Sequence, residues 1–259
     1  MIVDLHNHTP LCNHAEGEID EYIEAAIKAG TKIFGFSDHA PMDFDPEYRM
    51  KFEDMQQYEA AVKKAKKIYK EQIEVLLGYE VDYLPGHMDR RVLEADVDYL
   101  IGSVHFLQGW GFDNPEFIAK WQEQDIDEVW QNYFNTIEAM ALSGYFDIVG
   151  HFDLIKIFNY MPKGSIVAMA AKALEAIKES KMVLEINVAG YRKPIAEPYP
   201  SYDLLREAYK MEIPITLSSD AHKPEQVGLY NQEVMQMICE AGYKKVSYFI
   251  KREYKEIKL

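Results

Sequence analysis

The chain has 259 residues, of which 48% are hydrophobic and 27% are charged, so it can bury a substantial core and is not a disordered polypeptide. Its 43 acidic and 28 basic side chains leave a net charge of −15, which argues against binding to nucleic acid or to an anionic membrane, because both need basic patches. Two cysteines cannot build a disulfide framework, no apolar run reaches the ~18 residues of a membrane span, and no leader segment precedes the first apolar run. We therefore expect a soluble, cytoplasmic protein without a nucleic-acid or membrane partner.

Seven short apolar runs, rich in β-branched residues, predict buried strands rather than helices. In chain order they cover residues 2–5, 33–36, 74–77, 99–102, 146–149, 183–186 and 213–217. Apolar stripes at helical spacing lie between them and predict helices around residues 19–27, 55–69, 129–137, 167–177, 204–209 and 234–238. Gly30 and Gly144 are placed to end the first and the third of these helices.

The alternation of strand and helix predicts a parallel sheet, either closed into a barrel or open and doubly wound. The chain length matches a (β/α) barrel of the TIM type. No linker or low-complexity tract interrupts the pattern, so we expect a single domain over residues 1–259. The long aromatic segment 106–124 is typical of a lid or a pocket wall, or of a loop that packs over the barrel mouth.

Residues with metal-binding chemistry cluster at the ends of the predicted strands. The set comprises seven of the eight histidines and two carboxylates: His6, His8, His14, His39, Glu80, His105, His151, Asp220 and His222. Any one of these histidines could simply pack at a strand end. Because all strands of a parallel barrel end at one face, however, the set is expected to converge on one mouth. Only His87 lies elsewhere, in a predicted surface loop.

The composition of this set indicates a metal centre. In His6-x-His8 the two imidazoles point to the same side of an extended segment. Imidazoles with carboxylates, and no thiolate, suit Zn, Fe or Mn. Nine ligands exceed what one tetrahedral ion can use, so we expect two or three divalent ions. Such a centre polarises both the attacking and the leaving oxygen in a displacement at phosphorus, which favours hydrolysis of a phosphoester.

The ordered ligand set resembles the metal-binding pattern of the polymerase and histidinol phosphatase (PHP) superfamily. The segments 36–41, 80–83, 101–106 and 218–222 resemble those of stand-alone histidinol-phosphatases, and the resemblance extends from residue 1 to about residue 230. It implies a distorted seven-stranded barrel. It also implies hydrolysis of L-histidinol phosphate to L-histidinol and phosphate, a step of histidine biosynthesis, by attack of a hydroxide that bridges the ions.

The resemblance further implies how three ions share the ligands. His6, His8, Glu80 and Asp220 would hold the first ion; Glu80, His105 and His151 the second; and His14, His39 and His222 the third. Many members of the superfamily have a carboxylate at the position of His14. Cys12 is expected to be a buried thiol rather than a ligand, and Asp38 is expected to support His39.

Several polar residues are candidates for work on the substrate. Arg192 follows the sixth strand, and its guanidinium could bind the phosphate through two hydrogen bonds. Lys156 is the second candidate for this role, but it could equally be a lysine on a helix surface. Asp153 could protonate the leaving alkoxide, as could His39, or Asp153 could instead orient His151. Four further residues could meet the ammonium and imidazole of the substrate: Asp43, Glu197, Trp110 and Phe112.

Three other functions compete with this prediction. A related phosphoesterase could act on another small phosphomonoester, a nucleotide or phosphotyrosine. A metal amidohydrolase could use the same barrel, but those enzymes commonly place a modified lysine after the fourth strand, where this chain has Ser103-Val104-His105. A barrel without enzymatic activity would be expected to have lost a ligand, and none is missing. No heptad or apolar stripe predicts a particular oligomeric state.

Overall fold

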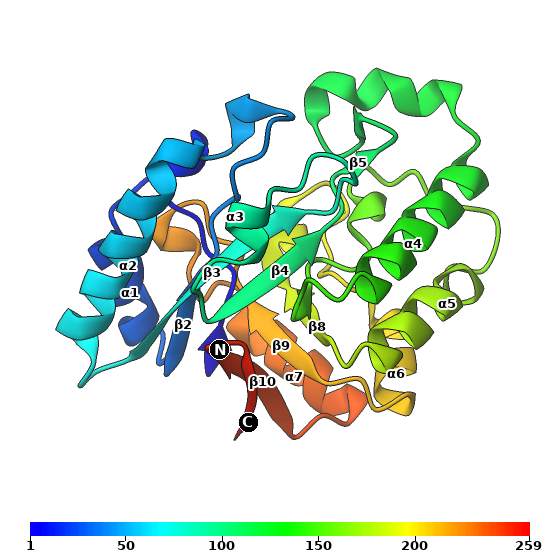
Figure 1. Ribbon diagram of the computed structural model, residues 1–259. Helices are drawn as coiled ribbons and strands as arrows, with labels where there is room; N and C mark the ends of the chain where they lie inside the picture. The colour runs from blue at the N-terminus through cyan, green and yellow to red at the C-terminus, as the bar shows by residue number, and fades with distance from the viewer.

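Seven parallel strands form the central sheet of the computed structural model, which describes all 259 residues (Figure 1). Their order in the sheet follows their order in the chain: β1 (Val3–Asp4), β2 (Ile33–Phe36), β3 (Glu74–Asp82), β4 (Tyr99–Ser103), β7 (Ile148–Val149), β8 (Val183–Asn187) and β9 (Ile215–Ser218). Every neighbouring pair is parallel, so all seven carboxyl ends lie at one end of the sheet.

The first and last strands meet and curl the sheet into a nearly closed barrel. The backbone N–H of Leu5 donates to the carbonyl of Leu217 at 3.1 Å, and the N–H of His8 donates to the carbonyl of Ala221 at 2.9 Å. The predicted distorted seven-stranded (β/α) barrel is therefore confirmed, and the open, doubly wound alternative is wrong.

Helices surround the barrel and cover the outer face of the sheet (Figure 1). They are α1 (Ile19–Lys28), α2 (Met55–Tyr69), the short α3 (Arg90–Leu93), α4 (Ile126–Leu142), α5 (Ile166–Glu179), α6 (Tyr202–Lys210) and α7 (Asn231–Ala241). The predicted helices are present, and the predicted stripe at 129–137 is the buried side of the longer α4. Side chains that accept backbone N–H groups cap α4 and α5 at Asp125 and Ser165. None of the helices is long and apolar enough to cross a bilayer.

The third strand is longer than predicted. It does not stop at Leu77 but continues to Asp82, because Gly78 lets the neighbouring strand approach closely. A Cβ atom at Gly78 would lie 2.5 Å from the Tyr99 ring. As a result, Glu80 lies within β3 rather than after it, and the side chains of Glu80 and Asp82 project from the same face.

Two features lie outside the repeating pattern of strands and helices. A C-terminal hairpin, β10 (Lys245–Ile250) with β11 (Glu253–Lys258), lies near the N-terminus at the end of the barrel remote from the strands' carboxyl ends (Figure 1). The carbonyl and carboxylate of Asp98, at the start of β4, accept backbone N–H groups of Arg252 and Lys251 and so hold it there. Segment 106–124 forms the small hairpin β5 (Phe106–Leu107) and β6 (Trp110–Gly111), followed by the 3-10 helix η4 (Pro115–Glu123).

Candidate metal centre

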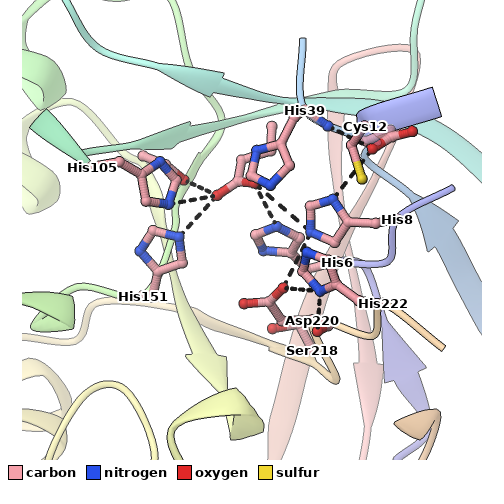
Figure 2. Close-up of polar contacts among 12 residues, drawn as sticks. His6, His8, Cys12, His39, His105, His151, Ser218, Asp220 and His222 are labelled. Atoms are coloured by element: carbon pink, nitrogen blue, oxygen red, sulfur yellow. Dashed lines mark hydrogen bonds and ion pairs between the residues drawn. The ribbon is translucent and has the colours of Figure 1, made fainter. Parts of the chain in front are cut away.

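All nine predicted ligand residues meet at the carboxyl ends of the strands, with Glu80 at the centre of the set. Figure 2 shows the side chains of His6, His8, His39, His105, His151, Asp220 and His222 gathered at this place. Glu80 Oε2 lies 3.2 Å from His6 Nε2 and 2.9 Å from His39 Nδ1. Glu80 Oε1 lies 2.9 Å from His151 Nε2 and 3.6 Å from His105 Nε2. His8 Nε2 also lies 3.8 Å from Glu80 Oε2, so one carboxylate faces five imidazoles that come from four strand ends.

His8 and His222 extend this set on the side of β1 and β9. His8 Nε2 lies 3.1 Å from Asp220 Oδ1, and the rings of His8 and His222 stack with centroids 4.0 Å apart. His222 Nε2 in turn lies 3.1 Å from His14 Nε2. Asp220 and His151 both have positive φ angles, 48° and 23°, a strained conformation that is common where the fold aims a functional side chain.

Three triads in this set have ligand atoms within 4.8 Å of one another: His6, His8 and Glu80; Glu80, His105 and His151; and His8, His39 and His222. The second triad has the residues implied for one ion, and the first has three of the four residues implied for another, without Asp220. In the third, the ring of His8 is closer than that of His14 to both partners. The set thus has the shape of three adjoining sites that share His8 and Glu80.

The chemistry of these residues fits divalent cations. His6 Nε2 is buried without a hydrogen-bond partner although it lies 3.2 Å from Glu80 Oε2. Burial, together with a nearby charge on His8, lowers the pKa of His39 to about 4 and the pKa of His222 well below its usual value, whereas the facing carboxylates raise the pKa of His6 and of His8 despite their burial. Neutral imidazole with its lone pair free is the form that ligates a metal.

Three carboxylates stand behind the imidazoles and fix their orientation. His6 Nδ1 lies 2.7 Å from Glu185 Oε1, and His105 Nδ1 lies 2.6 Å from Asp82 Oδ1. A carboxylate that accepts the Nδ1–H leaves Nε2 free toward the centre and makes the imidazole a stronger ligand. Sequence analysis missed both acids. Two signals in the sequence could have found them. Glu185 is a charged residue inside the apolar strand β8, and Asp82 follows Glu80 by two residues, so that both side chains lie on one face of an extended segment.

Asp38 is the third of these carboxylates. Its Oδ1 accepts the backbone N–H of His39 at 2.9 Å but lies 3.4 Å from Nδ1 of His8, so the imidazole that it supports is that of His8, not that of His39 as predicted. Cys12 is buried beside His8, as predicted. Burial raises the pKa of its thiol, and a protonated thiol is a poor ligand.

Replacing Asp82 with asparagine is expected to lower both kcat and the metal affinity of the Glu80, His105 and His151 triad by about 10- to 100-fold. Asp82 joins His105 to the buried guanidinium of Arg49, whose Nη1 donates to Asp82 Oδ2 at 2.9 Å. Steady-state kinetics with metal titration measure both quantities. Asp96→Asn, on the exposed surface, is the matched control, and equal behaviour of the two variants would contradict this role.

Arg192 lies beside the metal centre, where it was predicted. Its Nη2 donates to the carbonyls of Ser219 and Asp220, at 2.9 Å and 2.8 Å, while its Nη1 is buried without a partner. The side chain lines a cavity of about 640 Å³ at the barrel mouth, which also contains Glu80 and Asp220. Nη2 is therefore anchored to the backbone, and Nη1 is free to bind an anion in the cavity.

Lys156 and Asp153, in contrast, do not line this cavity. The Lys156 side chain is only 1% exposed, and its Nζ lies 2.9 Å from Asp153 Oδ2, 2.8 Å from Glu197 Oε1 and 2.8 Å from the carbonyl of Pro198. The interpretation of Lys156 as a surface lysine is therefore wrong, while its predicted binding of phosphate stays a prediction and its charge is already paired with Asp153 and Glu197. Asp153 Oδ2 lies against Lys156 and the backbone N–H of Ser201, and Asp153 Oδ1 is buried without a partner. Its predicted role as proton donor stays a prediction.

The segment 106–124 forms one wall of the cavity, as predicted, through Phe106, Asp113, Asn114, Glu116 and Phe117. The four candidates for contacts with the ammonium and imidazole do not line the cavity: Asp43, Glu197, Trp110 and Phe112. Phe112 is fully buried, and Asp43 pairs with His87, whose side chain is 38% exposed and does not line the cavity.

A parallel barrel with imidazoles and carboxylates gathered at the carboxyl ends of its strands defines the class of metal-dependent barrel enzymes. Within this class, the chain belongs to the PHP family, since the family described as PHP domain matches residues 4–189. The predicted superfamily is thus confirmed.

Two relatives in sequence and one solved structure with a similar fold are histidinol-phosphatases by name. The chain is 39% identical to a probable histidinol-phosphatase from Deinococcus radiodurans, over 95% of this chain and 96% of the relative. It is 31% identical to the histidinol-phosphatase of Bacillus subtilis, over 87% and 95% of the two chains. The fold is similar to the crystal structure of histidinol phosphate phosphatase from Lactococcus lactis complexed with zinc, L-histidinol and phosphate, with a TM-score of 0.81, 20% identity and 98% of both chains covered.

Proposed function

We propose that this protein is a metal-dependent phosphomonoesterase that hydrolyses L-histidinol phosphate to L-histidinol and phosphate. The observation that carries this proposal is the convergence of seven imidazoles, Glu80 and Asp220 beneath a cavity into which one guanidinium points. The relatives named histidinol-phosphatase, which cover nearly the whole chain, support the choice of substrate.

The nine ligand residues would hold two to three divalent ions, of Zn, Fe or Mn, with Glu80 and His8 at the junctions between sites. Bound there, such ions supply the Lewis acidity that activates water and neutralises charge on the phosphoryl oxygens. Glu185, Asp82 and Asp38 hold the imidazoles in the orientation that this requires.

The residues around the cavity bind and position the phosphate. Nη1 of Arg192 donates to a phosphoryl oxygen, because it is the buried cationic group in the cavity without a partner. Asn187 keeps the neighbouring acids in place: its Nδ2 lies 3.1 Å from Glu185 Oε2 and 3.0 Å from Asp220 Oδ2. The phosphate is thereby held between a fixed guanidinium and the metal centre, with the alcohol part directed along the cavity.

The domain organisation, the cellular location and the partner of the protein stay predictions. We propose that residues 1–259 form one domain, which a single cluster of 67 buried apolar residues supports. We also propose a cytoplasmic location, which agrees with two free cysteines. The partner is a small phosphorylated metabolite, and a net charge of −15 disfavours nucleic acid.

Phosphate release from a panel of compounds tests the proposed substrate. The metal-loaded protein should hydrolyse L-histidinol phosphate with a kcat/KM about 100-fold or more above that for p-nitrophenyl phosphate, phosphotyrosine or a nucleotide 3′-phosphate. Equal rates across the panel would leave a general phosphomonoesterase. Turnover of amides without phosphate release would replace the proposal with an amidohydrolase.

Removal of the ions by dipicolinate is expected to reduce phosphate release to background and to lower the melting temperature by roughly 5–10 °C. Without cations, Glu80, Asp220 and the buried imidazoles lose the groups that offset their burial. Zinc, manganese or iron added singly should restore both properties to different extents, as calorimetry and the phosphate assay will measure. Full activity in protein that elemental analysis finds free of metal would contradict the metal requirement.

A further inference from the structure

Most of the charged groups that line the cavity are paired. Arg49 binds Asp82 at 2.9 Å and Asp45 at 3.5 Å, while Glu80 and Asp220 face the imidazoles. Apart from Arg192, three charged side chains of the lining form no ion pair and no hydrogen bond with another side chain: Asp113, Glu116 and Lys193. Of these three, Glu116 and Lys193 are exposed, whereas Asp113 is only partly exposed. Burial raises the pKa of Asp113, whereas charge on His105 lowers it, so a cation beside the carboxylate would offset the cost of its burial.

The backbone next to Asp113 is fixed, so the carboxylate has a defined place on the cavity wall. Phe112 is fully buried, and its N–H donates to the carbonyl of His105 at 3.3 Å. The carbonyl of Phe112 accepts the indole N–H of Trp121 at 2.9 Å. Asp113 therefore follows a segment that is tied to the strand end carrying His105.

A second unpartnered polar group lines the same cavity. The hydroxyl of Tyr199 has no hydrogen-bond partner, although the residue is only 1% exposed. Its backbone pairs with Asn187 in both directions, at 2.7 Å and 2.9 Å, and its ring packs at 6.4 Å from that of His151. A buried hydroxyl without a partner is unfavourable unless a ligand supplies one.

Asp113 and Tyr199 come from other segments of the cavity wall than Arg192. Arg192 is anchored to the backbone of Ser219 and Asp220 beyond β9, whereas Asp113 lies after β4 and the ring of Tyr199 packs near His151 beyond β7. The cavity wall thus carries a guanidinium with one free nitrogen and, on a different loop, a carboxylate without a partner. A ligand with a phosphate at one end and a cation at the other matches these two groups.

We propose that Asp113, assisted by the Tyr199 hydroxyl, binds a cationic group, an ammonium or an imidazolium, in the alcohol part of the substrate and so selects cationic phosphomonoesters over neutral ones. This proposal rests on the proposed phosphatase function and adds a specificity-determining residue to it. The carboxylate accepts hydrogen bonds from the cation, and the hydroxyl accepts one further N–H.

The test compares substrates that differ in one charge. Kinetics are measured for the wild type, Asp113→Asn and Tyr199→Phe with three substrates: L-histidinol phosphate and 2-aminoethyl phosphate, whose alcohol parts are cationic, and ethyl phosphate, whose alcohol part is neutral. Asp113→Asn is expected to lower kcat/KM for the two cationic substrates by about 10- to 100-fold, mainly through KM, and to leave ethyl phosphate within about 2-fold. Tyr199→Phe should show the same selectivity with a smaller loss. Asp203→Asn, exposed on α6, is the matched control and should behave as the wild type.

Each other outcome has a distinct meaning. An equal loss on cationic and neutral substrates would show that Asp113 acts through His105, and no loss on either would show that it binds nothing; both overturn the subsite. A wild type that hydrolyses ethyl phosphate as well as 2-aminoethyl phosphate also refutes the subsite but leaves a phosphatase. A wild type that releases phosphate from none of these compounds refutes the proposed function itself.

Discussion

Replacing Glu80 with glutamine is expected to lower kcat by at least about 10³-fold. Both oxygens of this carboxylate face imidazoles, Oε2 those of His6 and His39 and Oε1 those of His105 and His151. A glutamine amide offers one neutral oxygen and one N–H₂ donor, so it cannot bridge two cations. The substitution is expected to remove the junction between two metal sites while it keeps the size of the side chain.

Elemental analysis of the purified variant should accordingly find at least one ion fewer per chain, and circular dichroism should find the barrel intact. His87→Ala is the control, because His87 is an exposed histidine that pairs with Asp43 away from the cavity. It should keep wild-type turnover and metal content. Equal losses in the two variants would mean that the centre does not depend on Glu80.

The barrel and its metal centre could be predicted because both follow from short-range patterns. Apolar runs between helical stripes define strands and helices, and parallel strands must end at one face. That geometric rule is sufficient to bring His6, His105 and Asp220 together although they are far apart in the chain. A ligand set at strand ends can therefore be predicted without knowledge of any side-chain rotamer.

The partners of buried charges could not be predicted in this way. Lys156 follows the same strand as His151, but its charge is taken up by Asp153, by Glu197 and by the carbonyl of Pro198, which is 42 positions away. Spacing along the chain gives no information about which loop closes over a strand end. The position of Asp153 beside a predicted ligand suggested a proton donor, whereas its pairing with Lys156 depends on that loop.

The local sequence pattern also could not predict the length of β3. The apolar run at 74–77 ends at Gly78, which normally weakens a strand, yet β3 continues to Asp82 because Tyr99 fills the space above the glycine. This tertiary contact places Glu80 and Asp82 on one face, so that the first reaches the metal centre and the second reaches His105. The pair is recognisable as Glu-x-Asp only once the segment is known to be extended.

Replacing Arg192 with alanine is expected to lower kcat/KM for L-histidinol phosphate by about 10²- to 10³-fold. Negative charge spreads over the phosphoryl oxygens in the transition state, and a fixed donor aimed at them contributes more there than in the ground state. Arg49 cannot replace it, because its guanidinium is committed to Asp82 and Asp45. Arg206→Ala, on the exposed face of α6, is the control and should leave kcat/KM unchanged.

Two further measurements separate phosphate binding from support of the metal centre, because Nη2 of Arg192 also holds the carbonyls of Ser219 and Asp220. If Nη1 binds phosphate, added guanidinium should partly restore activity to Arg192→Ala, and its metal content should equal that of the wild type. Arg192→Lys should recover only part of the loss, since an ammonium cannot keep both backbone contacts and reach the phosphate. A fall in metal content that parallels the fall in activity would instead assign Arg192 to the support of Asp220.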